Sequence, residues 1–201
     1  LTRDIQPAFS TVLDLSMVPD NNEDWSKVKY RGPFYGDFDA GDDLPYVCDQ
    51  FKEFLGKLHA ELDFDLTQAR FYASGSKGFH IEIPQECFIP KIPKEGTAYL
   101  AYIYREMAQS VIVNTLDLNV YTGKKGRQWR TPNVKRENGM YKVPITLDEA
   151  MEIDEVSYRE LIKAPRNVPN PSPAYCNPKF ALLYERSKEK VQGSMRNKKK
   201  R

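Results

Sequence analysis

A strand that leads through a short turn into an amphipathic helix is the feature that most constrains the fold of this chain. Residues 27–39 predict a strand, interrupted at Gly32 and Pro33. Residues 41–43 then supply turn and N-cap side chains. The helix that follows is expected to reach about Leu62, because apolar residues recur at helical spacing. These residues are Val47, Phe51, Phe54, Leu55 and Leu58.

The chain continues to alternate between strand and helix patterns beyond this unit. A long helix is predicted over 97–113, where an apolar stripe recurs. Further strands are predicted at 69–73, 79–83, 116–121 and 140–145. This alternation predicts an α/β or α+β domain built on a mixed sheet.

The last third of the chain carries helix caps and a proline-rich stretch. Two capping boxes, Thr146-x-x-Glu149 and Ser157-x-x-Glu160, predict two short helices. Residues 164–178 hold five prolines and predict an extended connector. Asn177 is expected to cap a last helix over 179–191, followed by a disordered basic tail at 192–201.

The composition predicts a globular chain without a membrane segment. Of its 201 residues, 40% are hydrophobic and 12% aromatic, which is enough for a core. No apolar run approaches the roughly 20 residues of a membrane span, and no secretory signal pattern is visible. We therefore expect a cytoplasmic protein with no membrane partner. The net charge of +2 does not by itself predict nucleic-acid binding, since five basic residues lie among the last eight.

The three cysteines do not form a metal-binding pattern. Cys48, Cys87 and Cys176 are far apart, and no C-x-x-C pair is present. Only His59 and His80 could assist them, so we expect no structural zinc site. Buried thiols in a reducing cytoplasm are the preferred interpretation.

Two aspartates on the first predicted strand are candidate metal ligands. Asp37 and Asp39 are two residues apart, so on a strand their carboxylates point to the same face. Such a pair repels unless a cation neutralises it, and its hard oxygen ligands favour Mg²⁺ or Mn²⁺. Two-metal phosphoryl transfer requires carboxylates in this kind of arrangement. The alternative is a strand end that runs into an Asp-rich turn.

The turn between two predicted strands has the residue types of an anion-binding loop. It contains two glycines, which would let backbone amides approach an anion closely. Ser74 and Ser76 add hydroxyl donors, Lys77 adds a positive charge, and His80 adds a donor on the next strand. Together they would suit a triphosphate, although the Walker spacing is absent. The alternative is a plain glycine hairpin with a satisfied histidine.

A third aspartate precedes a basic segment. Asp117 follows the long helix and could bridge the same metals as the first pair. Residues 124–142 contain seven Lys or Arg and one Glu, which favours contacts with phosphates, although a solvated surface is the default interpretation. Trp129 could stack on a base, but core packing is the preferred role. The candidate nucleic-acid contacts are Lys124, Lys125, Arg127, Trp129, Arg130, Lys135 and Arg136.

The order of these motifs resembles that of the archaeo-eukaryotic primase superfamily. The chain has D-x-D at 37–39, then S-G-x-K-G-x-H at 74–80, then a hydrophobic residue with Asp117 and R-x-x-R-x-P-N at 127–133. The resemblance covers about residues 30–147, and the second motif is its most specific part. The segment 138–144 is especially similar to primase-polymerases of plasmids, phages and other mobile elements.

The resemblance implies a fold, a reaction and a role for each residue. It implies a catalytic domain over 1–191 with an RRM-like half and flanking helices. Asp37, Asp39 and Asp117 would hold Mg²⁺ or Mn²⁺ for two-metal nucleotidyl transfer on a single-stranded DNA template. NTPs or dNTPs would be the substrates, and a helicase is an expected fused or separate partner. The residues implied to bind the nucleotide are Ser74, Ser76, Lys77, His80, Arg127 and Arg130.

Two other classes of protein remain open at this point. A non-catalytic binder of single-stranded DNA or of a replication origin would need the basic segment but not the acidic residues. A nuclease would use a carboxylate-metal site for hydrolysis but would have no need of a triphosphate loop. The zinc module and the helical priming domain of many relatives are not recognisable here, so extension of a strand is better supported than initiation.

Overall fold

A four-stranded sheet in the order β4-β6-β5-β9 forms the centre of the computed structural model, which describes residues 7–18, 27–121 and 128–199. All of its pairings are antiparallel. Its strands are β4 (Phe34–Asp39), β5 (Arg70–Ala73), β6 (Gly78–Ile83) and β9 (Val143–Ile145).

The connections place the first predicted strand next to the glycine hairpin. The chain leaves β4, forms helix α1 (Leu44–Leu62), and returns as β5, which turns tightly into β6. Because β6 inserts between β4 and β5, these three strands form a split β-α-β unit. After helix α2 (Leu100–Ser110) the chain pairs with the other edge of β4, through a bridge between Leu116 and Phe38.

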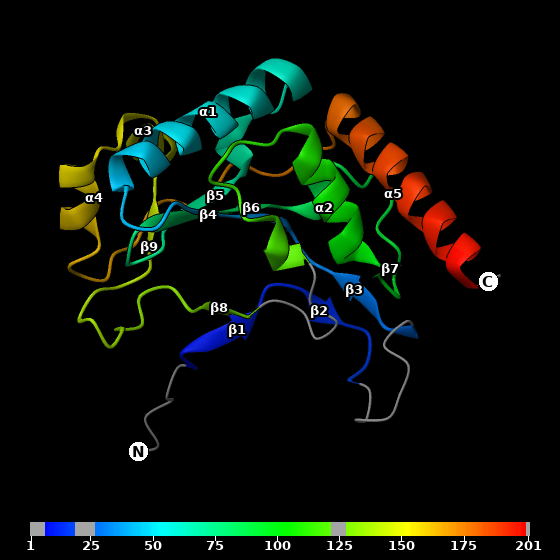
Figure 1. Cartoon of the computed structure of the whole chain (residues 1–201), viewed down its shortest axis with the longest axis horizontal. Coiled ribbons are helices and arrows are strands. Elements are labelled where there is room, and N and C mark those ends of the chain that lie inside the picture. The colour runs from blue at the N-terminus through cyan, green and yellow to red at the C-terminus, as the bar shows by residue number, and fades with distance from the viewer. Residues whose placement is uncertain (1–6, 19–26, 122–127, 200–201) are drawn as a thin grey trace.

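One face of the central sheet is apolar and carries the main core. Phe38 of β4 and Phe79 of β6 both point toward α1, where Phe51 stacks on Phe79 with ring centroids 4.5 Å apart. Figure 1 shows α1 along this side of the sheet. The core is dominated by aromatic rings, each of which buries a large apolar area. The apolar residues that recur at helical spacing in α1 therefore form one buried stripe that faces the sheet.

The other face of the sheet lies opposite a small ribbon (Figure 1). That ribbon pairs β1 (Phe9–Thr11) with β8 (Gln128–Arg130). A further three-stranded sheet has the order β2-β3-β7. Its strands are β2 (Asp14–Leu15), β3 (Lys29–Arg31) and β7 (Thr97–Ala98).

Three helices follow the sheet. Helices α3 (Leu147–Glu152) and α4 (Glu155–Leu161) come directly after β9, and α5 (Pro178–Lys199) packs along α2. The connector between α4 and α5 is extended, as its prolines predict. Asn177 caps α5 by accepting a hydrogen bond of 2.8 Å from the amide of Phe180, which confirms its predicted role.

The α+β class is confirmed, while several details of the prediction are wrong. The expected mixed sheet is absent from the described residues, since every pairing between the strands is antiparallel. The predicted strand at 116–121 is only a bridge followed by a 3-10 helix, Leu118–Tyr121. The long helix starts at Leu100, because Thr97 and Ala98 pair with β3 instead.

The ends of the last helices also differ from the prediction. The α4 cap is Asp154, with Ser157 completing the capping box from the third helical position. Helix α5 continues to Lys199, so the segment expected to be a disordered tail from 192 is helical through that residue. Lysine and arginine are good helix formers and favour the C-terminal end of the helix dipole, which explains the extension past Gly193.

The structure tests two further expectations, the burial of the cysteines and the absence of a membrane-spanning segment. Cys48 and Cys87 are buried, and burial raises the pKa of the Cys48 thiol to about 11. Cys176 is exposed, so the expectation of three buried thiols is wrong for that residue. In the described ranges, the helices are too short or too polar to cross a bilayer.

Candidate active site

The first aspartate of the D-x-D pair lies across from the histidine of the glycine hairpin. Asp37 on β4 is the register partner of His80 on β6, and the two side chains face each other. His80 Nε2 lies 3.4 Å from Asp37 Oδ1. The side chains are only 11% and 19% exposed, so this contact is screened less than a surface ion pair.

The third aspartate is brought directly beside the first. The amide of Asp117 donates a hydrogen bond of 2.8 Å to the carbonyl of Asp37, and the amide of Asp39 donates one of 3.0 Å to the carbonyl of Thr115. These two bonds flank the bridge between Leu116 and Phe38. Residues opposite each other in such a pair have Cβ atoms about 4.5–5.5 Å apart. The fold therefore gathers the three aspartates on adjacent backbone segments.

The carboxylates of Asp39 and Asp117 also cap the loops that follow them. Asp39 Oδ1 accepts a hydrogen bond of 2.8 Å from the amide of Gly41, and Asp117 Oδ1 accepts one of 2.8 Å from the amide of Asn119. Both aspartates line one open hollow of about 570 Å³. Over the described ranges, no three His, Cys, Asp or Glu side chains are arranged as a ready-made metal site.

The glycine hairpin lies at the same end of the sheet as Asp39. Gly78 is the register partner of Asp39, and the amide of Ser74 closes the turn on the carbonyl of Gly78. Gly75 has a φ of +81°, and a Cβ there would lie 2.5 Å from the carbonyl of Tyr141. A Cβ on Gly78 would lie 2.1 Å from the carbonyl oxygen of Phe38. The glycines are thus required by the close approach of neighbouring backbone.

A buried tyrosine of α4, Tyr158, forms hydrogen bonds with the backbone of this hairpin. The Tyr158 hydroxyl donates to the carbonyl of Gly78 at 2.9 Å, accepts from the amide of the same residue at 3.1 Å, and lies 3.4 Å from Ser74 Oγ. Burial raises the pKa of this phenol. Arg136 Nη1 donates to the carbonyl of Ser74 at 2.7 Å, and Asn138 Nδ2 donates to the carbonyl of Gly75 at 3.2 Å. The hairpin is therefore held rigidly by side chains from outside it.

The remaining polar side chains of the hairpin are accessible. Lys77 Nζ lies 3.3 Å from Asp42 Oδ1, in a pair whose acidic partner is fully exposed. Ser74 and Ser76 are half-buried. An exposed ion pair is worth little, so an anion with more charge can take Lys77 from Asp42 at small cost.

A stack of side chains covers the middle of the polar sheet face. Trp129 of β8 is buried and its ring lies 4.1 Å from that of His80, at 28°. Lys142 is 1% exposed, and its ammonium lies 4.4 Å from the ring centroid of Tyr72 and 4.8 Å from that of Trp129. These are cation-π contacts on two aromatic rings. The packing alternative for Trp129 is the one observed.

One buried and one half-buried ionisable group on this face have shifted pKa values. Burial lowers the pKa of Lys142 to about 8, against the attraction of Glu82 and Asp37. Burial also raises the pKa of Glu82, although Lys142 and Arg70 both lower it. Such opposed shifts on neighbouring groups mark this face as a candidate functional surface.

The basic residues predicted to contact nucleic acid differ in their location and contacts. Lys124, Lys125 and Arg127 lie outside the described residues. Lys135 is exposed. Arg136 is used to support the hairpin, as above, and the guanidinium of Arg130 lies 4.6 Å over the ring of Phe9.

Sequence reasoning missed two residues that the fold places at the site. Lys142 was counted only as part of a basic segment, and its single signal is a lysine inside a predicted strand. Tyr158 lies 80 residues from Gly78, so no local pattern could connect them.

Comparison of the chain with protein-family models, with curated proteins and with solved structures found no match. The function is therefore argued from the residues and their geometry.

Proposed function

We propose that this chain is a metal-dependent nucleotidyltransferase, a primase-polymerase that joins nucleoside triphosphates on a single-stranded DNA template. The observation that carries the proposal is the backbone pairing of Asp117 with Asp37, next to Asp39. Asp37 and Asp117, 80 positions apart, lie on paired backbone segments, and Asp39 lies two residues along the same strand, where Gly78 of the hairpin is its register partner. Like charges this close repel one another, and a bound cation would offset the cost of bringing them together.

The connectivity of the sheet supports the proposal. The strand order, counted from the Leu116 bridge, is bridge-β4-β6-β5, with α1 after β4 and α2 after β6. This order agrees with the β-α-β-β-α-β connectivity of the RRM-like half that the family resemblance implies, with a single bridge in place of the last strand.

The chemistry of the donor set fits a magnesium or manganese ion. Asp37, Asp39 and Asp117 offer carboxylate oxygens, the hard ligands that these ions prefer. Asp39 and Asp117 each have one oxygen engaged with a loop amide, which leaves the other for a cation. A bound ion would lower the pKa of an attacking hydroxyl and neutralise charge on the phosphates.

The protein's own groups would position the triphosphate. Lys77 and the hydroxyls of Ser74 and Ser76 lie on a hairpin whose backbone is fixed by Tyr158, so they can meet an anion without reorganisation. His80 is oriented by Asp37 from one side and by the Trp129 ring from another. A held imidazole of this kind can donate a hydrogen bond to a phosphate oxygen.

The test is strand synthesis on single-stranded DNA, with and without a primer, using labelled NTPs or dNTPs and Mg²⁺ or Mn²⁺. Replacing Asp37 or Asp117 by Asn should reduce synthesis at least about a hundredfold while the thermal midpoint stays close to that of the wild type. Asp49→Asn, an exposed acid on α1, is the matched control and should keep full activity. Synthesis by Asp37→Asn at the wild-type rate would refute the proposal.

A non-catalytic binder of single-stranded DNA is the second candidate. It is favoured by the local capping bonds of Asp39 and Asp117, which give these carboxylates a structural use. Such a protein would bind the template in the same assay and produce no labelled strand with any nucleotide or metal. A parallel reaction with labelled duplex and metal, but without nucleotides, detects the nuclease alternative.

A further inference from the structure

A groove runs between the polar face of the central sheet and the β1–β8 ribbon. It has a volume of about 430 Å³ and lies at the end of the strands away from the glycine hairpin. Its floor comes from β5, β6 and the residue before β9, and its wall from the ribbon. The charged and aromatic residues that line it are Arg70, Tyr72, Glu82, Glu86, Trp129, Arg130 and Lys142.

The lysine in this groove is buried, and no carboxylate of the described residues lies within ion-pair distance of it. Within the described part of the chain, the Lys142 ammonium has no hydrogen-bond acceptor and no carboxylate within ion-pair distance, although the residue is 1% exposed. The ammonium lies against the two aromatic rings described above, and Glu82 and Asp37 attract it from beyond ion-pair distance. A buried charge is costly unless it is paired or hydrogen-bonded. Because neither carboxylate contacts the ammonium directly, Lys142 can pair with an anion that enters the groove.

Two arginines line the same groove and are similarly available. Neither Arg70 nor Arg130 has a carboxylate within ion-pair distance among the residues that the structure describes. Arg70 is exposed and stands opposite Glu82 in the sheet register. Three cations thus face two acids, Glu82 and Glu86, and burial raises the pKa of Glu82. The groove has a net positive charge.

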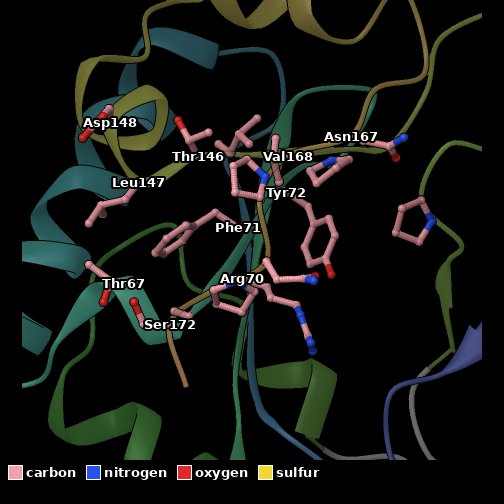
Figure 2. A pocket seen from close by; sticks show the side chains of 17 residues that line it. Thr67, Arg70, Phe71, Tyr72, Thr146, Leu147, Asp148, Asn167, Val168 and Ser172 are labelled. Carbon is pink, nitrogen blue, oxygen red and sulfur yellow. The ribbon is translucent and has the colours of Figure 1, made fainter. Parts of the chain in front are cut away.

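The groove continues along the sheet into a second hollow. Arg70, Tyr72 and Pro132 line both, and the second hollow has a volume of about 510 Å³. Figure 2 shows Arg70 and Tyr72 projecting into it, with Asn167 and Val168 of the connector on its far side. An extended chain-like ligand could therefore lie across the face, and a small anion alone would fill only part of it.

We propose that this groove binds a phosphodiester group of a nucleic-acid strand through Lys142, Arg70 and Arg130. The inference rests on the proposed function, which supplies the kind of ligand. Glu82 is two residues along β6 from His80, or roughly 6.6 Å at the rise of a strand. The groove therefore adjoins the candidate active site without including Asp37, Asp39 or Asp117. The backbone of a nucleic-acid strand bound in the groove would run toward the candidate active site.

The experiment measures binding of a fluorescent oligodeoxythymidylate by anisotropy, in EDTA and without triphosphates. Lys142→Met keeps the length and apolar stem of the side chain, and Arg70→Met changes an exposed position of the same groove. Each should bind about tenfold more weakly at low salt. Each should also reduce the salt slope by about 0.7, the loss of one phosphate contact on a single strand. Lys94→Met, an exposed lysine elsewhere, should bind like the wild type.

A second titration, with a nucleoside triphosphate and Mn²⁺, separates the two sources of phosphate. Arg70→Met, which lies away from the three aspartates and the hairpin, should bind the triphosphate with wild-type affinity. The inference is overturned if oligonucleotide binding is unchanged in both variants, or if only triphosphate binding is weakened. Should Lys142→Met fail to fold, as judged by circular dichroism, Arg70→Met decides the question alone.

The two proposals fail in different ways. Because the binding assay contains neither metal nor triphosphate, it reports strand capture and not synthesis. A wild-type protein that binds through the groove but makes no strand contradicts the proposed function and leaves the groove intact. If the wild-type protein makes strands while both variants bind the oligonucleotide normally, the proposed function stands and the groove proposal is contradicted.

Discussion

The two faces of the central sheet are built from the same strands and have opposite character. On β4, Phe38 enters the aromatic core beneath α1, while its neighbours Asp37 and Asp39 point to the other side. On β6, Phe79 and His80 divide in the same way. The apolar face gains stability from burial, whereas the polar face holds a lysine, a histidine and several acids at a cost. The polar face is the one on which the proposed binding and chemistry would take place.

Removing an aromatic ring from the apolar face should have the largest effect on folding. Phe79 is fully buried and stacks on Phe51. Phe79→Ala removes this packing and leaves a cavity, so the free energy of unfolding should fall by about 3–5 kcal/mol in urea denaturation. Phe9→Ala, at a ring that is 47% exposed, is the control and should cost well under half as much. Equal losses would contradict the assigned contrast between buried and peripheral rings.

Lys142 on the polar face should make stability depend on pH in a specific direction. Its folded pKa of about 8 lies below the unfolded value of 10.5, so between these values the unfolded chain binds more protons. Stability of the wild type should therefore rise with pH across this window relative to Lys142→Met, by about 2–3 kcal/mol. The groups that face the ammonium are Glu82 and Asp37, which are common to both proteins.

The comparison uses the difference between wild type and variant because buried tyrosines and cysteines also titrate at high pH. Chemical denaturation at pH 8, 9 and 10 follows the difference in the free energy of unfolding between the two proteins across this window. A difference that stays constant, or that falls as pH rises, would show that Lys142 is not buried as a charged group.

The smallest expected effect concerns the boundary between the two faces. Tyr158→Phe removes the hydroxyl that pairs with both backbone groups of Gly78 and contacts Ser74. Leaving these buried groups unpaired should cost about 1–2 kcal/mol of stability. If the hairpin holds the triphosphate, the KM for nucleotide should rise more than kcat falls. The reason is that the change removes hydrogen bonds to the hairpin and none to the three aspartates.

Tyr141→Phe is the matched control for that change. Its hydroxyl has no hydrogen-bond partner within the described residues, although its backbone lies against Gly75. It should alter neither stability nor KM. Should both variants behave alike, Tyr158 would be a packing residue with no role in positioning the hairpin.

Local patterns in the sequence were sufficient for most elements of the fold. The apolar spacing of α1, its Asp43 cap, and the glycine hairpin between β5 and β6 all follow from neighbouring residues. They could be predicted because helix caps, turn glycines and periodicity are properties of short segments. The shift of the α2 start and the reduction of 116–121 to a bridge could not, since both depend on pairing with β3 and β4.

Residue types and their spacing were enough to name the candidate residues: two aspartates on one strand, a serine-, lysine- and histidine-bearing turn, and a later aspartate. Which of them lie together became clear only from the folded chain. It brought Asp117 to Asp37, assigned Arg136 to the hairpin, buried Trp129, and placed Lys142 in a groove. The physical reason is that side-chain type is a local property, whereas burial and proximity depend on strand order and register, which are set by the packing of the whole domain.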